Sequence, residues 1–223
     1  MALKALLTIF LFVFPWQIRR LILSRVLGYQ IHSTARIGLS IVVPEMLEMG
    51  PASRIGNLTL CKGLALLQMG EGTSIGNLNQ ITGFPANDSS FFTADRERRP
   101  ELILGCHAAV TERHIIDCTN SVRIGKFATF AGYRSQILTH SIDLYQCQQK
   151  SKPVVMGNYC FVGTGSVLLS GSALPDYSVL GAGSLLNKEY SETYFLYAGN
   201  PARAVKPLSH DTGYFGRETG GVH

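Results

Sequence analysis

Apolar residues recur at every sixth position through residues 156–186. The repeating positions are Met156, Val162, Leu168, Leu174, Leu180 and Leu186. An α-helix brings apolar residues round at steps of three and four, and a simple strand at steps of two, so a step of six fits neither. It fits a short strand followed by a tight corner, with three such units closing one coil of about 18 residues. The pattern therefore predicts a parallel β-helix, in which each coil buries its apolar face by stacking on its neighbours.

Small residues stand at a fixed place in each step, four positions after the apolar residue. They are Cys160, Ser166, Ser172, Ser178 and Ser184. A small side chain lets the chain turn a corner, while the apolar residue fills the axis of the coil. We therefore interpret Cys160 as a packing residue.

The step of six begins at Ile31 and is interrupted twice, at 84–100 and at 141–153. Both interruptions carry charged residues, and we expect them to leave the coil at the surface. The first has two interpretations, a binding loop or an ordinary solvated face. The repeat predicts a β-helix domain over 29–206, followed by a loose polar tail over 207–223.

The N-terminal segment 1–28 has a different pattern. Residues 6–14 are apolar but for one threonine, a run too short for a membrane-spanning helix of about 20 residues. Residues 17–27 have the spacing of an amphipathic helix with arginines, and Gly28 suits its C-cap. Two compatible interpretations follow. The segment 1–27 makes a peripheral contact with the anionic inner face of the cell membrane, with its arginines on phosphates, or it packs on the open end of the β-helix.

Composition narrows the classes of function. The chain has 223 residues, enough for one domain with a real core, and a net charge of +5. This charge suits an anionic cofactor or a membrane surface and is too weak to indicate nucleic acid. Five cysteines without paired spacing predict neither a disulfide framework nor a zinc site. We therefore expect a reducing, cytoplasmic compartment and no metal.

Four short motifs resemble one family. They are Pro153-Val154-Val155-Met156-Gly157, Val162-Gly163, Leu180-Gly181-Ala182-Gly183-Ser184 and Ala198-Gly199-Asn200-Pro201-Ala202-Arg203. Together they resemble the hexapeptide-repeat acyltransferases, and more narrowly the O-acetyltransferases of surface-polysaccharide synthesis. The resemblance implies an all-β, left-handed parallel β-helix, a homotrimer, and acetyl-CoA bound as co-substrate between neighbouring subunits. The left hand comes from the resemblance alone, since parallel crossovers are otherwise nearly always right-handed.

Acetyl transfer to a hydroxyl needs a base, and histidine titrates near neutrality. His140 matches the general base of the family, because it stands just before a loop and about one coil ahead of the clean repeat. We expect Asp143 to orient the imidazole or to hold a sugar hydroxyl; the alternative is an ordinary loop carboxylate. His114 and Asp117, about one coil earlier, are candidates for the acceptor pocket or for a solvated turn.

Five positions match residues that bind coenzyme A in the family. Thr164 and Ala182 match corner positions where the pantetheine arm lies against the backbone. Lys188, Arg203 and Lys206 match basic residues near the phosphates, and Arg203 has the most specific context because it follows Gly-Asn-Pro-Ala. Each basic residue taken alone is equally explained as a surface charge.

The leading prediction is an acetyl-CoA-dependent O-acetyltransferase that transfers the acetyl group directly to a sugar hydroxyl. One alternative is a β-helical carbonic anhydrase, which needs three histidines on zinc, whereas only His140 and His114 lie near the expected region. The other alternative is a non-catalytic trimeric scaffold or membrane-docking module that has lost coenzyme A binding.

Overall fold

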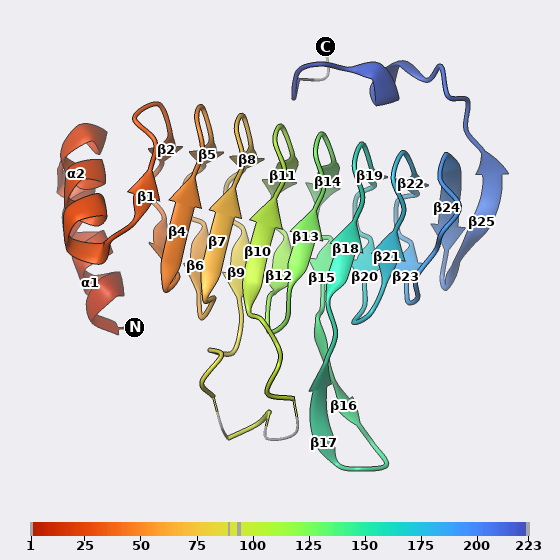
Figure 1. The fold of residues 1–223 in the computed structure, drawn as a ribbon, viewed down its shortest axis with the longest axis horizontal. Helices are drawn as coiled ribbons and strands as arrows, with labels where there is room; N and C mark the ends of the chain where they lie inside the picture. The colour runs from red at the N-terminus through yellow and green to blue at the C-terminus, as the bar shows by residue number, and fades with distance from the viewer. Residues whose placement is uncertain (1, 89, 93–94, 222–223) are drawn as a thin grey trace.

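The computed structural model describes residues 2–88, 90–92 and 95–221. Seven coils stack into a column, and each coil contributes one strand to each of three sheets (Figure 1). We call the sheets A, B and C, in the order in which each coil visits them. The strands of successive coils pair in parallel, which confirms the predicted parallel β-helix.

The strands are short and evenly spaced along the chain. Sheet A contains β1 (Gln30–Ile31), β4 (Met46–Met49), β7 (Leu66–Met69), β10 (Glu101–Leu104), β13 (Val122–Ile124), β18 (Val154–Met156) and β21 (Ala173–Leu174). Sheet B contains β2 (Arg36–Ile37), β5 (Arg54–Ile55), β8 (Ser74–Ile75), β11 (Ala109–Glu112), β14 (Thr129–Tyr133), β19 (Phe161–Val162), β22 (Val179–Leu180), β24 (Phe195–Gly199) and β25 (Ala202–Pro207). Sheet C contains β3 (Ile41–Val43), β6 (Leu60–Lys62), β9 (Gln80–Thr82), β12 (Ile115–Asp117), β15 (Gln136–Ile137), β20 (Val167–Leu168) and β23 (Leu185–Leu186).

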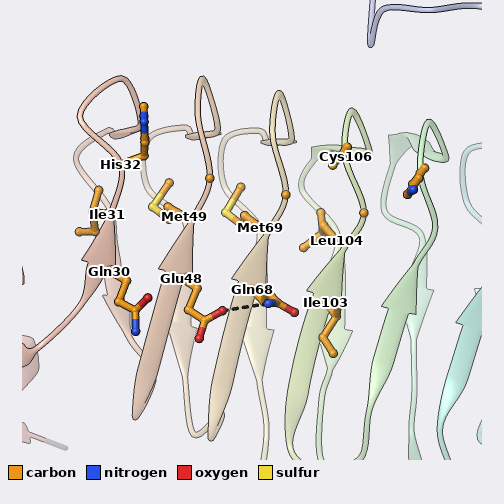
Figure 2. Close-up of a pocket in the computed structure, with 14 residues that line it drawn as sticks. Gln30, Ile31, His32, Glu48, Met49, Gln68, Met69, Ile103, Leu104 and Cys106 are labelled. Atoms are coloured by element: carbon orange, nitrogen blue, oxygen red, sulfur yellow. Dashed lines mark hydrogen bonds between the residues drawn. The ribbon is translucent and has the colours of Figure 1, made fainter.

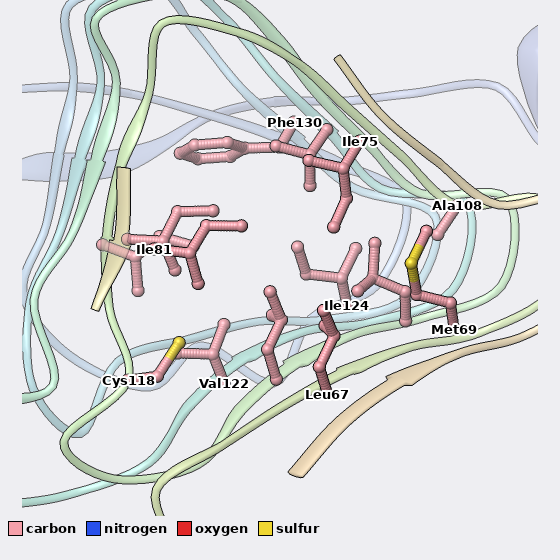
Figure 3. Packing of buried hydrophobic residues seen from close by; sticks show 14 of the residues in the cluster. Leu67, Met69, Ile75, Ile81, Ala108, Cys118, Val122, Ile124 and Phe130 are labelled. Atoms are coloured by element: carbon pink, nitrogen blue, oxygen red, sulfur yellow. The ribbon is translucent and has the colours of Figure 1, made fainter. Parts of the chain in front are cut away.

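The core runs along the axis of the column, where the apolar residues of the repeat stack on one another. Met69 of sheet A, Ile75 of sheet B and Ile81 of sheet C point inward from the three walls of one coil (Figure 3). Met69 pairs in register with Met49 of the coil before it and Leu104 of the coil after it. Like residues therefore stack on like residues, and one coil alone would leave its apolar side chains exposed.

The small residues of the repeat are buried at the corners, as predicted. The hydroxyl of Ser166 donates to the carbonyl oxygen of Gly163 in the same corner, at 2.9 Å. Close approach of successive coils also demands glycine at some corners. Gly63 has φ +79°, and a Cβ there would lie 2.0 Å from the carbonyl oxygen of Gly83 in the next coil.

Helices cover the first end of the column, where the strands of the first coil have no preceding partner. They are α1 (Ala2–Phe10), the 3₁₀ turn η1 (Leu11–Val13) and α2 (Trp16–Leu27). Gly28 ends α2 in the left-handed conformation with φ +71°, which confirms it as the C-cap. No helix in the described part of the chain is both long and apolar enough to cross a membrane.

Polar side chains of these helices bond the exposed carbonyl groups of the first coil. The indole N–H of Trp16 donates to the carbonyl oxygen of Ala35 at 2.9 Å, and the Arg19 guanidinium donates to that of Gly38 at 2.7 Å. Arg19 is buried and faces the column. An unpaired strand edge invites aggregation, so this cap protects the fold. The structure thus supports the packing interpretation of the segment, and Arg19 is not free to contact lipid phosphates.

Two segments leave the column at the corner between sheets C and A, and both lie on the same side of the molecule (Figure 1). The first is the loop 83–100, between β9 and β10. The second is an antiparallel hairpin of β16 (His140–Asp143) and β17 (Gln148–Ser151). These are the two interruptions that the sequence predicts.

The C-terminal tail differs from the loose segment that the sequence predicts. After β25 the chain turns back and runs along the corner between sheets A and B, with a 3₁₀ turn η2 (Gly213–Gly216) (Figure 1). The tail lies against a ladder of stacked rings with centroids 3.8 to 5.2 Å apart. The ladder consists of His107, Phe127, Tyr159, Tyr177, Tyr194 and His210.

Phe215 attaches the tail to this ladder. Its ring meets Tyr177 and Tyr194 edge-on, and it is 6% exposed. The hydroxyl of neighbouring Tyr214 lies 3.0 Å from the carbonyl oxygen of Cys160, to which it donates. The rings from His107 to Tyr194 repeat at about the spacing of adjacent strands because they follow one another along the column, and His210 stacks on Tyr194 from the tail.

We expect Phe215→Ala to release the tail, because it removes the buried ring that holds the tail on the column. The free energy of unfolding should fall by about 3 kcal/mol. Trypsin should also cleave faster after Arg217. Denaturant unfolding and timed proteolysis measure the two effects, and Glu218→Ala, an exposed change in the same tail, is the control. Unchanged stability and protection in Phe215→Ala would contradict the docking of the tail.

Candidate active site

His140 is the first residue of β16, where the chain leaves sheet C for the hairpin. Ser151 faces it across the hairpin. From the loop 83–100, the rings of Phe84 and Phe92 meet the imidazole edge-on, with centroids at 5.8 and 6.1 Å. The side chain of His140 nevertheless remains 31% exposed. The imidazole therefore stands in a niche with aromatic walls that is open to solvent.

Asp117, the last residue of β12, holds the imidazole in place. Its Oδ2 lies 2.7 Å from Nδ1 of His140. A carboxylate only accepts hydrogen bonds, so Nδ1 carries the proton and Nε2 of the neutral ring keeps a free lone pair. Nε2 has no hydrogen-bond partner among the described residues. This tautomer is the one that a general base requires.

Asp117 is 7% exposed, and hydrogen bonds from its neighbours satisfy its carboxylate. Oδ2 also accepts from the backbone N–H of Thr139 at 2.9 Å and from the Thr139 hydroxyl at 2.8 Å. Oδ1 accepts from the backbone N–H of Thr119 at 3.1 Å and from the Thr119 hydroxyl at 2.6 Å. A buried carboxylate without such donors would be strongly destabilising. The corner is thus built to keep Asp117 ionised beside His140.

The electrostatics of the pair follow from this geometry. Burial raises the pKa of Asp117, but hydrogen bonds from His140, Thr119 and Thr139 outweigh it and leave that pKa below its ordinary value. The hydrogen bond to Asp117 raises the pKa of His140, against the opposing effect of partial burial. The carboxylate therefore stabilises the imidazolium that forms when Nε2 takes a proton.

Arg98 fixes the loop 83–100 to the same corner. One guanidinium nitrogen donates to the carbonyl oxygens of Phe84 at 2.6 Å and Thr119 at 3.2 Å, and the other donates to that of Pro85. The guanidinium also lies 4.5 Å from the ring centroid of Phe92. Arg98 is 5% exposed, so it acts as an internal tie between the aromatic wall and the turn that holds Asp117.

The structure does not bring Asp143 or His114 to the imidazole. Asp143 lies three residues along β16 from His140 and therefore on the opposite face of the hairpin. It pairs with Lys150 and accepts the N–H groups of the hairpin turn. His114 is 1% exposed inside the column, where its Nδ1 accepts from the N–H of Ser135 at 3.2 Å. Burial lowers the pKa of His114 to about 4, so the ring is neutral.

The histidines that a zinc-dependent carbonic anhydrase would need do not lie close together in this chain. His114 lies inside the column while His140 lies in the niche. Within the described ranges no group of three or more His, Cys, Asp or Glu side chains is arranged to hold a metal ion. The geometry of this chain gives the carbonic anhydrase alternative no support.

The predicted coenzyme A residues lie at two different corners. Thr164 and Ala182 occupy successive coils at the corner between sheets B and C, where the N–H of Gly183 donates to the carbonyl oxygen of Thr164 at 2.9 Å. Both are exposed, and the Thr164 hydroxyl donates to the carbonyl oxygen of Tyr133 at 2.9 Å. Lys188 is exposed at the corner between sheets C and A, which is the corner of His140.

Arg203 and Lys206 project from the exposed edge strand β25. Arg203 pairs with Ala198 across the β24–β25 hairpin, directly beyond the Ala182 corner. The turn between these strands contains a cis peptide bond, Asn200–Pro201.

A wide, open groove lies elsewhere on the molecule. It runs over sheet A near the corner with sheet B, beside the buried Met49 and Met69, and on it Glu48 accepts a hydrogen bond from Gln68 at 2.8 Å (Figure 2). No residue of the predicted site lines it. The predicted site residues therefore lie away from this groove.

Comparison with known proteins identifies the fold. No protein-family model matches the sequence, and no curated protein matches it. Among solved structures, the polysialic acid O-acetyltransferase OatWY is 18% identical with a TM-score of 0.62, over 83% of this chain and 90% of that one. A hexapeptide-repeat-containing acetyltransferase from Vibrio cholerae is 19% identical with a TM-score of 0.53, over 64% and 74%.

The same Vibrio cholerae acetyltransferase complexed with acetyl coenzyme A gives a TM-score of 0.52 at 20% identity, over 64% of this chain and 71% of that one. At these identities the likeness establishes the fold. The column is a left-handed β-helix of the kind found in hexapeptide-repeat acetyltransferases, as the sequence resemblance implies.

Sequence reasoning did not find the roles of Asp117, Arg98 and the two phenylalanines. Asp117 was a candidate for the acceptor pocket, whereas the structure makes it the partner of the imidazole. The spacing between Asp117 and His140 was one available signal. The two residues are 23 positions apart, which is one coil of about 18 residues plus a few inserted residues, so they can lie at the same corner of successive coils. Nothing in the sequence indicated which residues of the loop 83–100 would face inward.

We expect Asp117→Asn to change the pH profile of kcat/KM in two ways. A general base at His140 would make activity rise with pH as Nε2 loses its proton. Without the carboxylate the pKa of His140 falls, so this rise should move to lower pH. The plateau should drop roughly 100-fold or more, because the required tautomer is no longer held. Asp211→Asn, in the exposed tail, should leave the profile unchanged; an unshifted profile in Asp117→Asn would contradict the assigned pairing.

Proposed function

We propose that this chain is an acetyl-CoA-dependent O-acetyltransferase that acts on a sugar hydroxyl in cell-surface polysaccharide synthesis. The observation that carries the proposal is the Asp117–His140 pair, which leaves a basic nitrogen open in a niche beside a surface loop. The likeness of the fold to OatWY and to the Vibrio cholerae acetyltransferase supports the same class of chemistry.

The proposed reaction is a direct transfer in one ternary complex. Nε2 of His140 takes the proton of the acceptor hydroxyl as its oxygen attacks the thioester carbonyl carbon of acetyl-CoA. The tetrahedral intermediate collapses, the carbon–sulfur bond breaks, and the imidazolium returns the proton to the departing thiolate. Asp117 stabilises the imidazolium between these steps. The products are the acetylated sugar and free coenzyme A.

Acetyl-CoA is proposed to bind along the last coils. Thr164 and Ala182 offer an exposed corner for the pantetheine arm, and a small side chain at Ala182 permits close approach. Arg203 and Lys206 on β25 are exposed cations at the end of that corner, suited to the phosphates. Lys188 is a further exposed cation.

A homotrimer would reconcile the positions of base and donor. His140 stands at the corner between sheets C and A, whereas Ala182 and Arg203 stand at or beyond the corner between sheets B and C. In one chain the width of sheet C separates them. A neighbouring subunit that places its B–C corner against the C–A corner of this one would complete the site.

Two variants should separate catalysis from donor binding. His140→Ala should lower kcat roughly 10²- to 10⁴-fold, because the base is lost, and should still bind acetyl-CoA. Arg203→Ala should weaken acetyl-CoA binding about tenfold through the loss of one charge-assisted contact. Titration calorimetry measures binding, and coenzyme A release with polysialic acid and other glycans measures turnover. A fully active His140→Ala protein would refute the proposed mechanism.

We also propose that the chain is cytoplasmic and contacts the inner face of the membrane through residues 1–27. The outward side of α1 and of the following turn η1 exposes apolar residues: Leu3 is 80% and Val13 79% exposed, and the exposed Leu6 and Phe10 lie between them in the chain. No acidic residue precedes Glu45. The cap thus presents apolar surface with no carboxylate to repel anionic lipid.

A paired change of Leu6→Asp and Phe10→Asp should abolish binding to vesicles that contain anionic lipid, since it places two charges in the apolar row. Vesicle flotation of the full chain measures the bound fraction. Leu58→Asp, at an equally exposed corner outside the cap, should float like the unmodified protein. Failure of the unmodified chain to float would exclude the membrane contact.

A further inference from the structure

The loop 83–100 carries an aromatic cluster that the proposed chemistry does not yet use. The cluster consists of Phe84, Phe91 and Phe92. Phe84 is its centre, with ring centroids 5.5 Å from Phe91, 5.3 Å from Phe92 and 5.8 Å from His140. Phe92 is 2% exposed, so it is a wall of the niche. Phe91 is 54% exposed and presents its ring to solvent.

Local hydrogen bonds hold Phe91 in this exposed position. Oδ1 of Asp88 accepts the backbone N–H of Ser90 at 2.8 Å and that of Phe91 at 3.3 Å. This is the Asx-turn pattern, in which an aspartate side chain fixes the two or three residues that follow it. A large apolar side chain fixed in water is costly unless something packs on it.

Two described residues of the loop, Asp95 and Arg98, bond the elements that carry the base. Arg98 binds the loop to the turn of Thr119, whose hydroxyl contacts Asp117. Oδ2 of Asp95 accepts the backbone N–H of Ser151 at 2.9 Å and the Ser151 hydroxyl at 2.5 Å. Ser151 is the residue opposite His140 in the hairpin. The position of Phe91 relative to the imidazole is therefore fixed from two sides.

We propose that Phe91, backed by Phe84, is the acceptor subsite, on which a pyranose ring packs its C–H face. The inference rests on the proposed function and names the class of acceptor: a saccharide that binds by stacking. The ring of Phe84 adjoins both the ring of Phe91, at 5.5 Å between centroids, and the imidazole, at 5.8 Å. A sugar on Phe91 can thus present a hydroxyl of the same ring, or of the next ring in the chain, to Nε2.

The nearby hairpin supplies a matched control. Tyr145, at its tip, is 102% exposed and lies on the same projecting side of the column. If an exposed aromatic ring affected only solubility or a subunit contact, replacing Phe91 or Tyr145 would have the same effect on the kinetics. The subsite proposal instead separates the two, because only Phe91 adjoins the ring that touches His140.

A binding measurement tests the subsite without catalysis. Phe91→Trp places an indole in the proposed subsite, and the chain has one other tryptophan, Trp16, in the N-terminal cap. Titration with methyl glycosides of glucose, galactose, N-acetylglucosamine and sialic acid should change the emission of Phe91→Trp saturably and leave the unmodified protein unchanged. The same titration in a His140→Ala background should give the same result, so it does not depend on the proposed mechanism. No response to any of these glycosides would overturn the subsite.

A kinetic measurement then distinguishes a role of Phe91 in acceptor binding from a role in donor binding, subunit contact or membrane contact. With the best glycoside as acceptor, Phe91→Ala should raise the acceptor KM about five- to tenfold, the effect of roughly 1 kcal/mol from one aromatic contact. The KM for acetyl-CoA should stay within twofold, Phe91→Trp should restore the acceptor KM, and Tyr145→Ala should change neither. A changed sedimentation coefficient in Phe91→Ala would assign the ring to a subunit contact, and lost vesicle binding would assign it to the membrane; either result overturns the proposal.

Discussion

Each coil of this column forms its sheet hydrogen bonds and buries its apolar residues through the coils before and after it. No coil has a second apolar face of its own on which to pack. Met49, Met69 and Leu104 show the consequence, because each is buried by the residue one register above and below it. Stability is then approximately a sum of contacts between nearest neighbours, and the two ends of the column are its weak places.

The first end and one corner are covered by segments outside the repeat. The helices at the first end place Trp16 and Arg19 on carbonyl groups that would otherwise have no partner. The tail returns from the last coil and packs Phe215 against the ring ladder. The cap and the tail stabilise the column in different ways. The cap satisfies polar backbone groups, whereas the tail buries aromatic surface. The outer side of α1 and η1 nevertheless remains apolar, with Leu3, Leu6 and Phe10 exposed.

The Asp117–His140 pair lies where the regular repeat is interrupted. At the C–A corner Asp117 directly follows the inward-facing Ile116, and His140 comes three residues after the inward-facing Ile137. Asp117 and His140 can occupy that corner because Thr119 and Thr139 donate to the carboxylate, and because Arg98 and Asp95 fasten the loop and the hairpin around it. The loop and the hairpin thus frame the niche around His140.

The sequence by itself determined the period, the parallel β-helix, the two excursions and the position of His140 at the start of one of them. These features follow from local rules, because an apolar residue at every sixth position fits a short strand and a tight corner repeated in a coil. The left-handedness of the coil came from the resemblance to a known family. Only the tertiary structure decided that Asp117 rather than Asp143 meets the imidazole, that His114 is internal, and that the tail packs along a corner. Each of these depends on how far a corner is displaced when a loop is inserted, and on contacts between residues several coils apart. The composition of the loop and of the tail does not show how far a corner is displaced. The contacts of their side chains therefore become apparent only in the stacked structure.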